Sequence, residues 1–318
     1  MSRARMGVAA LAVMVFAVGV TTLPAVAGNY PDKPISLIEP YPAGSISDLG
    51  ARVLARQLST ELGQPVRVIA APGANTAVGA SKLQQERADG SAIFWDIVSQ
   101  LGYVIASKEL PYTAADFQGV AMLGGESLAY ITRADDNRFP TVADMVTYAK
   151  AHPGALSVAN SGDGDSKKAL DDLEAAAQIK ANSIPYSGGS TILTALLGAH
   201  VDLGITAPSN AINNDKLRVL MVVTADKTYP PLPGAVTAGS AGYDIASPLL
   251  RGVFVKKGTP PSVIKILSDA TQKAMQSDEW HAFSKRFSQI EAPDGPDATD
   301  ASLQKEVARW QAYLKAKQ

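Results

Sequence analysis

Short apolar runs alternate with amphipathic stretches from residue 35 onward. Residues 35–38, 66–69 and 92–95 predict buried strands, and residues 77–86 predict a helix between the last two. Between the first two strands, apolar side chains recur at helical spacing, at Leu49, Val53, Leu54, Leu58 and Leu62. This succession of strand and helix predicts a parallel, doubly wound α/β sheet.

A second unit of the same kind follows. Thr141 and Asp144 resemble the capping box that begins a helix, and residues 156–159 and 168–178 predict the next strand and helix. Further strands are predicted at 183–186, 201–205 and 217–223. Further helices are predicted at 261–275 and around Leu303, Val307, Trp310 and Leu314.

No low-complexity linker separates the two units, which favours two lobes joined by crossing strands. We expect the first lobe to comprise residues 28–125 and 226–318, and the second lobe residues 126–225.

The first 27 residues have the layout of a secretory signal peptide. Arg3 and Arg5 precede the uncharged stretch 6–20, and Ala25 and Ala27 form an A-x-A cleavage pattern. The alternative is a transmembrane anchor, but the apolar run is shorter than the roughly 20 residues that span a bilayer. We therefore expect export to the periplasm.

Composition removes several classes of function. The net charge of −1 provides no electrostatic footprint for nucleic acid or for an anionic membrane. The chain has no cysteine, which excludes disulfides, thiolate metal sites and cysteine nucleophiles.

Two glycine- and serine-rich loops are candidates for binding an anion. Each connects a predicted strand to a predicted helix, where open α/β sheets bind ligands and where helix N-termini offer free N–H groups. The first loop contains Tyr41, Pro42, Ala43, Gly44, Ser45, Ile46, Ser47 and Asp48, and the second contains Ser161, Gly162, Asp163, Gly164, Asp165 and Ser166. Either loop alone could be a plain turn that caps its own helix. The pair, in equivalent positions of two units, predicts a donor-rich wall on each side of a cleft.

Motifs for other chemistry are absent from the sequence. It has no nucleotide-phosphate loop, and Asp163 and Asp165 lack the further ligands of a calcium loop. The scattered histidines are expected at the surface or at helix ends; they are His152, His200 and His281. The tryptophans are expected in the core; they are Trp95, Trp280 and Trp310. We therefore predict a binding protein without a metal, a cofactor or catalytic residues.

Several short motifs in order resemble the tripartite tricarboxylate transporter substrate-binding proteins, also called the TctC or Bug family. The resemblance begins with the first loop and extends over essentially the whole chain after residue 27. Its pieces are residues 30–35, 40–44, 47–48, 72–74, 89–90, 110–112, 116–117, 148–154, 185–189, 196–202 and 258–261. No single piece is specific; the ordered set is.

The resemblance implies a two-lobed periplasmic-binding-protein fold, with a doubly wound sheet in each lobe and the ligand cleft between them. It implies capture of a small carboxylate, such as a di- or tricarboxylate, an acidic amino acid or an aromatic acid, and delivery to a membrane permease. We expect a monomer. The implied ligand-binding positions are Tyr41, Ala43, Gly44, Ser45, Ser47 and Asp48 in the first loop, and Ser161, Gly162, Gly164 and Ser166 in the second.

The second loop departs from the family pattern because it is acidic. Asp163 and Asp165 would disfavour an anionic ligand unless they cap the helix, pair with Lys167 or Lys168, or meet an amino group of the ligand. Two other functions stay open: a partner of a membrane signalling protein, which would use the same ligand site, and an exported hydrolase.

Overall fold

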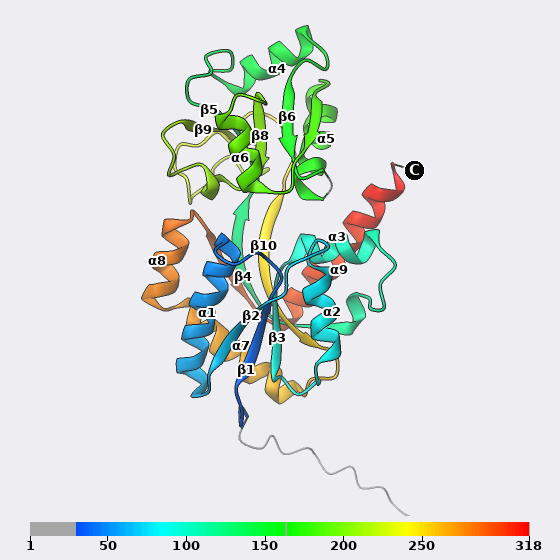
Figure 1. Ribbon diagram of the computed structural model, residues 1–318, viewed down its shortest axis with the longest axis vertical. Helices are drawn as coiled ribbons and strands as arrows, with labels where there is room; N and C mark the ends of the chain where they lie inside the picture. The colour runs from blue at the N-terminus through cyan, green and yellow to red at the C-terminus, as the bar shows by residue number, and fades with distance from the viewer. Residues whose placement is uncertain (1–29, 163, 318) are drawn as a thin grey trace, which may run out of the picture.

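The computed structural model describes residues 30–162 and 164–317. The predicted signal peptide and Asp163 lie outside these residues. Two β-sheets, one of six strands and one of five, form the centres of two lobes that follow one another along the longest axis of the molecule (Figure 1).

The sheet of the first lobe has the strand order β11-β4-β10-β3-β1-β2. Its strands are β1 (Ile35–Glu39), β2 (Val66–Ala70), β3 (Ala92–Ile97), β4 (Phe117–Ser127), β10 (Pro248–Lys256) and β11 (Ile290–Asp294). The three strands β2, β1 and β3 are parallel, whereas β10 runs antiparallel to both β3 and β4.

The sheet of the second lobe has the order β7-β6-β8-β5-β9. Its strands are β5 (Ala129–Arg133), β6 (Ser157–Asn160), β7 (Asn182–Pro185), β8 (Leu203–Thr206) and β9 (Leu217–Val222). Strands β7, β6 and β8 are parallel, and β5 runs antiparallel to both of its neighbours.

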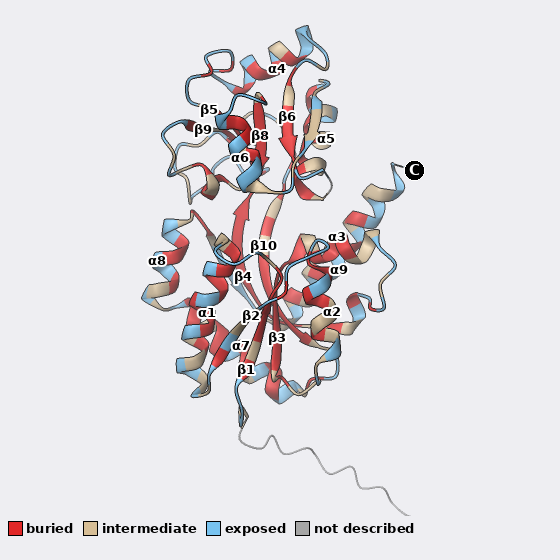
Figure 2. Cartoon of the chain, viewed as in Figure 1, coloured by how far each residue is buried: buried red, intermediate tan, exposed pale blue. Residues whose placement is uncertain are grey.

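Helices cover both faces of the first sheet. They are α1 (Ile46–Leu62), α7 (Pro261–Met275) and α8 (Asp278–Arg286) on one face, and α2 (Ala77–Gln85), α3 (Val98–Ser107) and α9 (Pro296–Lys315) on the other. The second lobe contains α4 (Val142–Ala151), α5 (Asp165–Ala177) and α6 (Gly189–Leu197), and short 3₁₀ turns occupy η1 (Ala114–Asp116) and η2 (Pro208–Asn210). Figure 2 shows buried residues concentrated along the strands and on the helix faces that cover them.

The central strands β3, β5 and β8 are almost fully buried, because helices cover the sheets on both sides, whereas the edge strands β2, β7 and β11 carry exposed positions. Trp95 of β3 and Trp280 of α8 meet edge to face within the core under α1. Trp310 of α9 is also buried, against Tyr103. The predicted placement of the tryptophans in the core is confirmed.

The chain crosses between the lobes twice. Strand β4 leads through Leu128 directly into β5, and the chain returns through Ser247 into β10. Backbone hydrogen bonds join the crossings: Leu128 N–H donates to Ser247 O at 3.0 Å, and Ser247 N–H donates to Val223 O at 2.9 Å. Ala238 and Ile245, which precede the return, pack in the core of the second lobe. The predicted lobe boundaries at 125/126 and 225/226 stay predictions.

The α/β class and the binding-protein architecture are as the sequence predicts, but the expectation of a parallel sheet holds only for the strands joined by helices. The sequence did not predict β4, β5, β10 and β11, whose antiparallel pairing makes both sheets mixed. A strand that leaves a lobe and a strand that returns to it run in opposite directions, so their pairing is antiparallel. No helix within residues 30–162 and 164–317 is long and apolar enough to cross a membrane.

Candidate ligand-binding site

The carboxyl ends of the parallel strands in both lobes face the crossing between them. Strands β3 and β4 run in the same direction because both are antiparallel to β10. The carboxyl ends of β1, β2 and β3 therefore point the way that β4 leaves the first lobe. In the second lobe Ala129, the first residue of β5, lies opposite Thr206, the last residue of β8. The loops that follow the parallel strands of the two lobes thus face one another, as a ligand site between lobes requires.

Hydrogen bonds within the first loop hold it in a fixed conformation. Ser45 Oγ caps α1 by accepting from the N–H of Asp48 at 3.1 Å, and the Asp48 carboxylate accepts from the N–H of Gly44 at 2.9 Å. Gly44 has φ +81°, a conformation that side-chain-bearing residues avoid. This arrangement leaves the first-turn N–H groups of Ile46 and Ser47 without an acceptor among the described residues, at the positive end of the helix dipole.

The side chains of Ser47 and Asp48 are buried behind the loop. Ser47 Oγ accepts from the Nε1–H of Trp95 at 2.8 Å. Asp48 forms an ion pair of 2.9 Å with Arg52, one helical turn later. Burial works against ionisation of Asp48, but hydrogen bonds from Arg52 and Gly44 outweigh it and lower its pKa. These side chains support the loop, whereas Ala43 and Gly44 are exposed.

Tyr41 connects the first loop to the floor of the site. Its hydroxyl lies 2.6 Å from Asp96 Oδ1 and 2.9 Å from Gln100 Oε1, and its N–H donates to Glu39 Oε2 at 3.1 Å. The ring packs against a hydrophobic cluster that continues from Ile97 and Leu249 of the first lobe into the core of the second. A hydroxyl has one proton, so it satisfies only one of these two acceptors unless Asp96 is itself protonated.

Glu39 and Asp96 are fully buried at the carboxyl ends of the adjacent strands β1 and β3. Burial raises the pKa of each carboxyl group to about 7. Near neutral pH both are partly protonated, and the two acids repel a bound anion much less than two full charges would.

The second loop is also held by its own side chains. The N–H of Ser161 donates to Ser166 Oγ at 2.8 Å, and the N–H of Gly162 donates to Asn160 Oδ1 at 2.8 Å. Gly162 and Gly164 have φ +81° and +71°. Ser161 and Gly162 are exposed, whereas Ser166 is buried.

Asp165 is paired across the lobes rather than with the neighbouring lysines. Its Oδ2 accepts from Ser99 Oγ at 2.7 Å, and its Oδ1 accepts from Arg309 at 3.0 Å, both in the first lobe. Lys167 and Lys168 instead pair with Asp171 and Asp172 one turn later.

A third loop, between β7 and α6, also lies at the carboxyl ends of the parallel strands of the second sheet. The sequence analysis did not include it among the candidate positions. A side chain added at Gly189 would meet Thr206 Oγ1 at 2.7 Å and Asn210 Nδ2 at 2.8 Å. Asn210 donates to Thr206 Oγ1 at 3.0 Å. The sequence feature that could have identified this loop is the run Ser187-Gly188-Gly189 between a strand and a helix.

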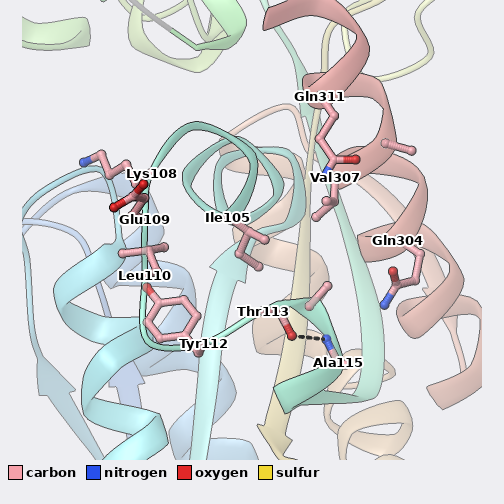
Figure 3. A pocket seen from close by; sticks show the side chains of 12 residues that line it. Ile105, Lys108, Glu109, Leu110, Tyr112, Thr113, Ala115, Gln304, Val307 and Gln311 are labelled. Carbon is pink, nitrogen blue, oxygen red and sulfur yellow. Dashed lines mark hydrogen bonds between the residues drawn. The ribbon is translucent and has the colours of Figure 1, made fainter. Parts of the chain in front are cut away.

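A surface hollow of about 590 Å³ lies elsewhere, on the first lobe. Figure 3 shows it between the segment that follows α3 and the exposed side of α9, with Lys108, Tyr112 and Gln311 among its lining residues. Neither candidate loop contributes to it.

The histidines take no part in the candidate site. His152 ends α4, and His200 and His281 are exposed, as the sequence analysis predicted. Among the described residues, no group of three histidine or acidic side chains could hold a metal ion.

Two α/β lobes with loops facing across a double crossing define a solute-binding protein. The Tripartite tricarboxylate transporter family receptor model matches residues 50–318, and the chain belongs to this family. Its members are periplasmic solute-binding proteins, which are not enzymes; they bind small carboxylates and work with a transporter.

Individual relatives agree with this assignment. The chain is 30% identical to Protein BugT of Bordetella pertussis over 92% of its length and 91% of the relative's. A TctC solute-binding protein from Polaromonas, solved without ligand, is 26% identical with a TM-score of 0.71, over 90% of this chain and 99% of that one.

Two further structures share the fold at lower identity. MatC of Rhodopseudomonas palustris, solved with malate, is 21% identical with a TM-score of 0.74 and covers 89% of this chain and 99% of its own. Rpa4515 of R. palustris, solved with adipate, is 23% identical with a TM-score of 0.78 and covers 90% of this chain and 97% of its own.

Proposed function

We propose that this chain captures a small carboxylate in the periplasm, between the loops 41–48 and 161–166, and delivers it to the permease of a tripartite tricarboxylate-type transporter. It acts as a monomer after cleavage of residues 1–27. The observation that carries the proposal is the first turn of α1, where a capped and hydrogen-bonded loop presents N–H groups toward the opposite lobe.

The chemistry of this loop suits a carboxylate. Backbone N–H groups at a helix start bind anions without a basic side chain, and an ordered loop loses little entropy when the ligand arrives. Ala43, Gly44 and Ser45 line the approach, with Ile46 and Ser47 as main-chain donors. Ser161, Gly162, Gly164 and Ser166 face them from the second lobe. Malate and adipate, bound to two structures of the same fold, are small dicarboxylates.

Calorimetric titration of the mature protein with a panel of small acids tests the function. The panel comprises di- and tricarboxylates, aromatic acids and acidic amino acids, with the corresponding amides as controls. We expect saturable binding of at least one acid and none of its amide, because the amide lacks the charge that the helix start stabilises. Binding of none of these acids would contradict the proposal.

Substitutions of two glycines, one at each end of α1, test where the ligand binds. Gly44 and Gly63 both have left-handed backbone, at φ +81° and +64°, and open space where a side chain would begin. Gly44→Val and Gly63→Val therefore impose a similar backbone strain, of roughly 1–2 kcal/mol. We expect only Gly44→Val to abolish acid binding, because it distorts and covers the donor loop. Equal affinities of the two variants would place the ligand elsewhere.

A further inference from the structure

Three side chains at the carboxyl end of the chain, in α9 and just after it, reach across from the first lobe to α5 of the second. They are Arg309 and Tyr313, one turn apart on the same face of α9, and Lys317, two residues after the helix ends. Their partners on α5 are Asp165 and Asp171. Figure 1 shows the carboxyl end of α9 rising beside the second lobe.

The inner contact, between Arg309 and Asp165, is the most enclosed. The Asp165 side chain is 4% exposed, and it accepts hydrogen bonds from both Arg309 and Ser99. Ser99 belongs to α3 and is itself fixed, because its carbonyl accepts from the Nε1–H of Trp310 at 2.8 Å. Removing one partner of such a pair leaves an uncompensated buried charge, so a substitution at Arg309 should disfavour the arrangement in which the lobes are together.

Arg309 is held ready for this contact by its own lobe. Its guanidinium lies 4.5 Å from the centre of the Trp310 ring, and it forms an ion pair of 2.6 Å with Glu306. An arginine already oriented by its neighbours loses little side-chain entropy when Asp165 docks.

The outer contacts lie nearer the solvent. Tyr313 and Lys317 both bond to Asp171, which also pairs with Lys167 of its own helix. Lys317 is 45% exposed, so its ion pair is screened by water and salt.

We propose that Arg309, Ser99 and Asp165 form a latch between the lobes, which favours the closed arrangement and sets the position of the second loop. Asp165 is the first residue of α5 and directly follows Gly164 of that loop, so a shift of Asp165 moves the donors around it. The acid that departs from the family pattern thus acts on lobe closure. This inference rests on the proposed function for its effect on affinity, but not for its effect on the lobes.

The first experiment needs no ligand. The chain has no cysteine, so spin labels attach only to cysteines introduced at the exposed alanines Ala176 of α5 and Ala301 of α9. Double electron–electron resonance then measures the distance between the two labels, one on each lobe. Arg309→Met should add a population with a longer distance between the two labels. Lys265→Met, which removes an exposed ion pair within α7, should leave the distance distribution unchanged.

Because Arg309→Met leaves Asp165 buried without its partner, the double variant Asp165→Asn/Arg309→Met serves as a second test. It removes both charges and should show the same longer distance. Distance distributions identical to those of the unmutated protein in both variants, or an equal change in Lys265→Met, would overturn the latch.

The second experiment measures dissociation of a bound carboxylate by stopped flow. Closure limits release, so loss of the latch should raise the dissociation rate about tenfold, and Lys317→Met should raise it about twofold or less. An unchanged rate in Arg309→Met contradicts the latch. Failure of the unmutated protein to bind any acid contradicts the proposed function instead, and the label distances still decide the latch.

Discussion

Glu39 shows at the scale of one residue how burial changes the chemistry of the site. It is fully buried at the end of β1, and burial raises its pKa to about 7. The folded state therefore binds this proton more tightly than the unfolded state does. The stabilisation of the folded state by this bound proton is complete below the ordinary pKa of about 4.5, and it is lost as the pH rises through 7.

Replacing Glu39 by glutamine should remove this dependence. Between pH 5 and pH 8 the free energy of unfolding of the unmutated protein should fall by about 1–3 kcal/mol more than that of Glu39→Gln. Denaturant titrations at both pH values measure the difference. Parallel pH profiles for the two proteins would show that this carboxyl group titrates normally.

Asp165 marks the limit of what single residues reveal in the sequence. The sequence identified it as an unusual acid in a donor loop and left open a helix cap, a lysine partner or a ligand amino group. In the structure it pairs with Arg309, 144 residues later in the chain. No local pattern encodes a contact of that range, whereas the lysines next to it do find their partners at helical spacing.

At the scale of elements, the amphipathic helices and the fully apolar strands could be predicted. The helix predicted at 261–275 coincides with α7, and the capping box at Thr141 and Asp144 forms as expected. Strand β4 was not predicted because Gly119, Gly124 and Gly125 interrupt its apolar pattern and the strand carries bulges. The two crossings depend on such strands, so the pairing directions could not be predicted either.

Substitutions at two helix caps should distinguish an effect on ligand binding from an effect on stability. Ser45 caps α1 at the site, and Ser277 caps α8 outside both loops, each by accepting a backbone N–H. Ser45→Ala and Ser277→Ala should each lower the free energy of unfolding by about 1 kcal/mol. Calorimetry should find weaker carboxylate binding only in Ser45→Ala, because its loop loses a hydrogen bond beside the donors. A similar loss of affinity in Ser277→Ala would mean that general destabilisation explains both.

At the scale of the whole molecule, the register of β5 with β8 and the direction of β4 turn both sets of donor loops toward each other. The sequence predicted both loops from their composition, but the loop before α6 and the inter-lobe contacts emerged only with the fold. The paired crossings at Leu128 and Ser247 give the lobes a short shared hinge, about which closure can occur.

The central claim is that a small carboxylate binds between the lobes, against the start of α1. A crystal structure of the chain with the acid that binds most tightly in calorimetry tests it directly. We predict carboxylate oxygens within hydrogen-bond distance of the N–H groups of Ile46 and Ser47, with the loop 161–166 closed over the ligand. An acid bound only in the surface hollow beside Tyr112 and Gln311, or on one lobe alone, would contradict the account.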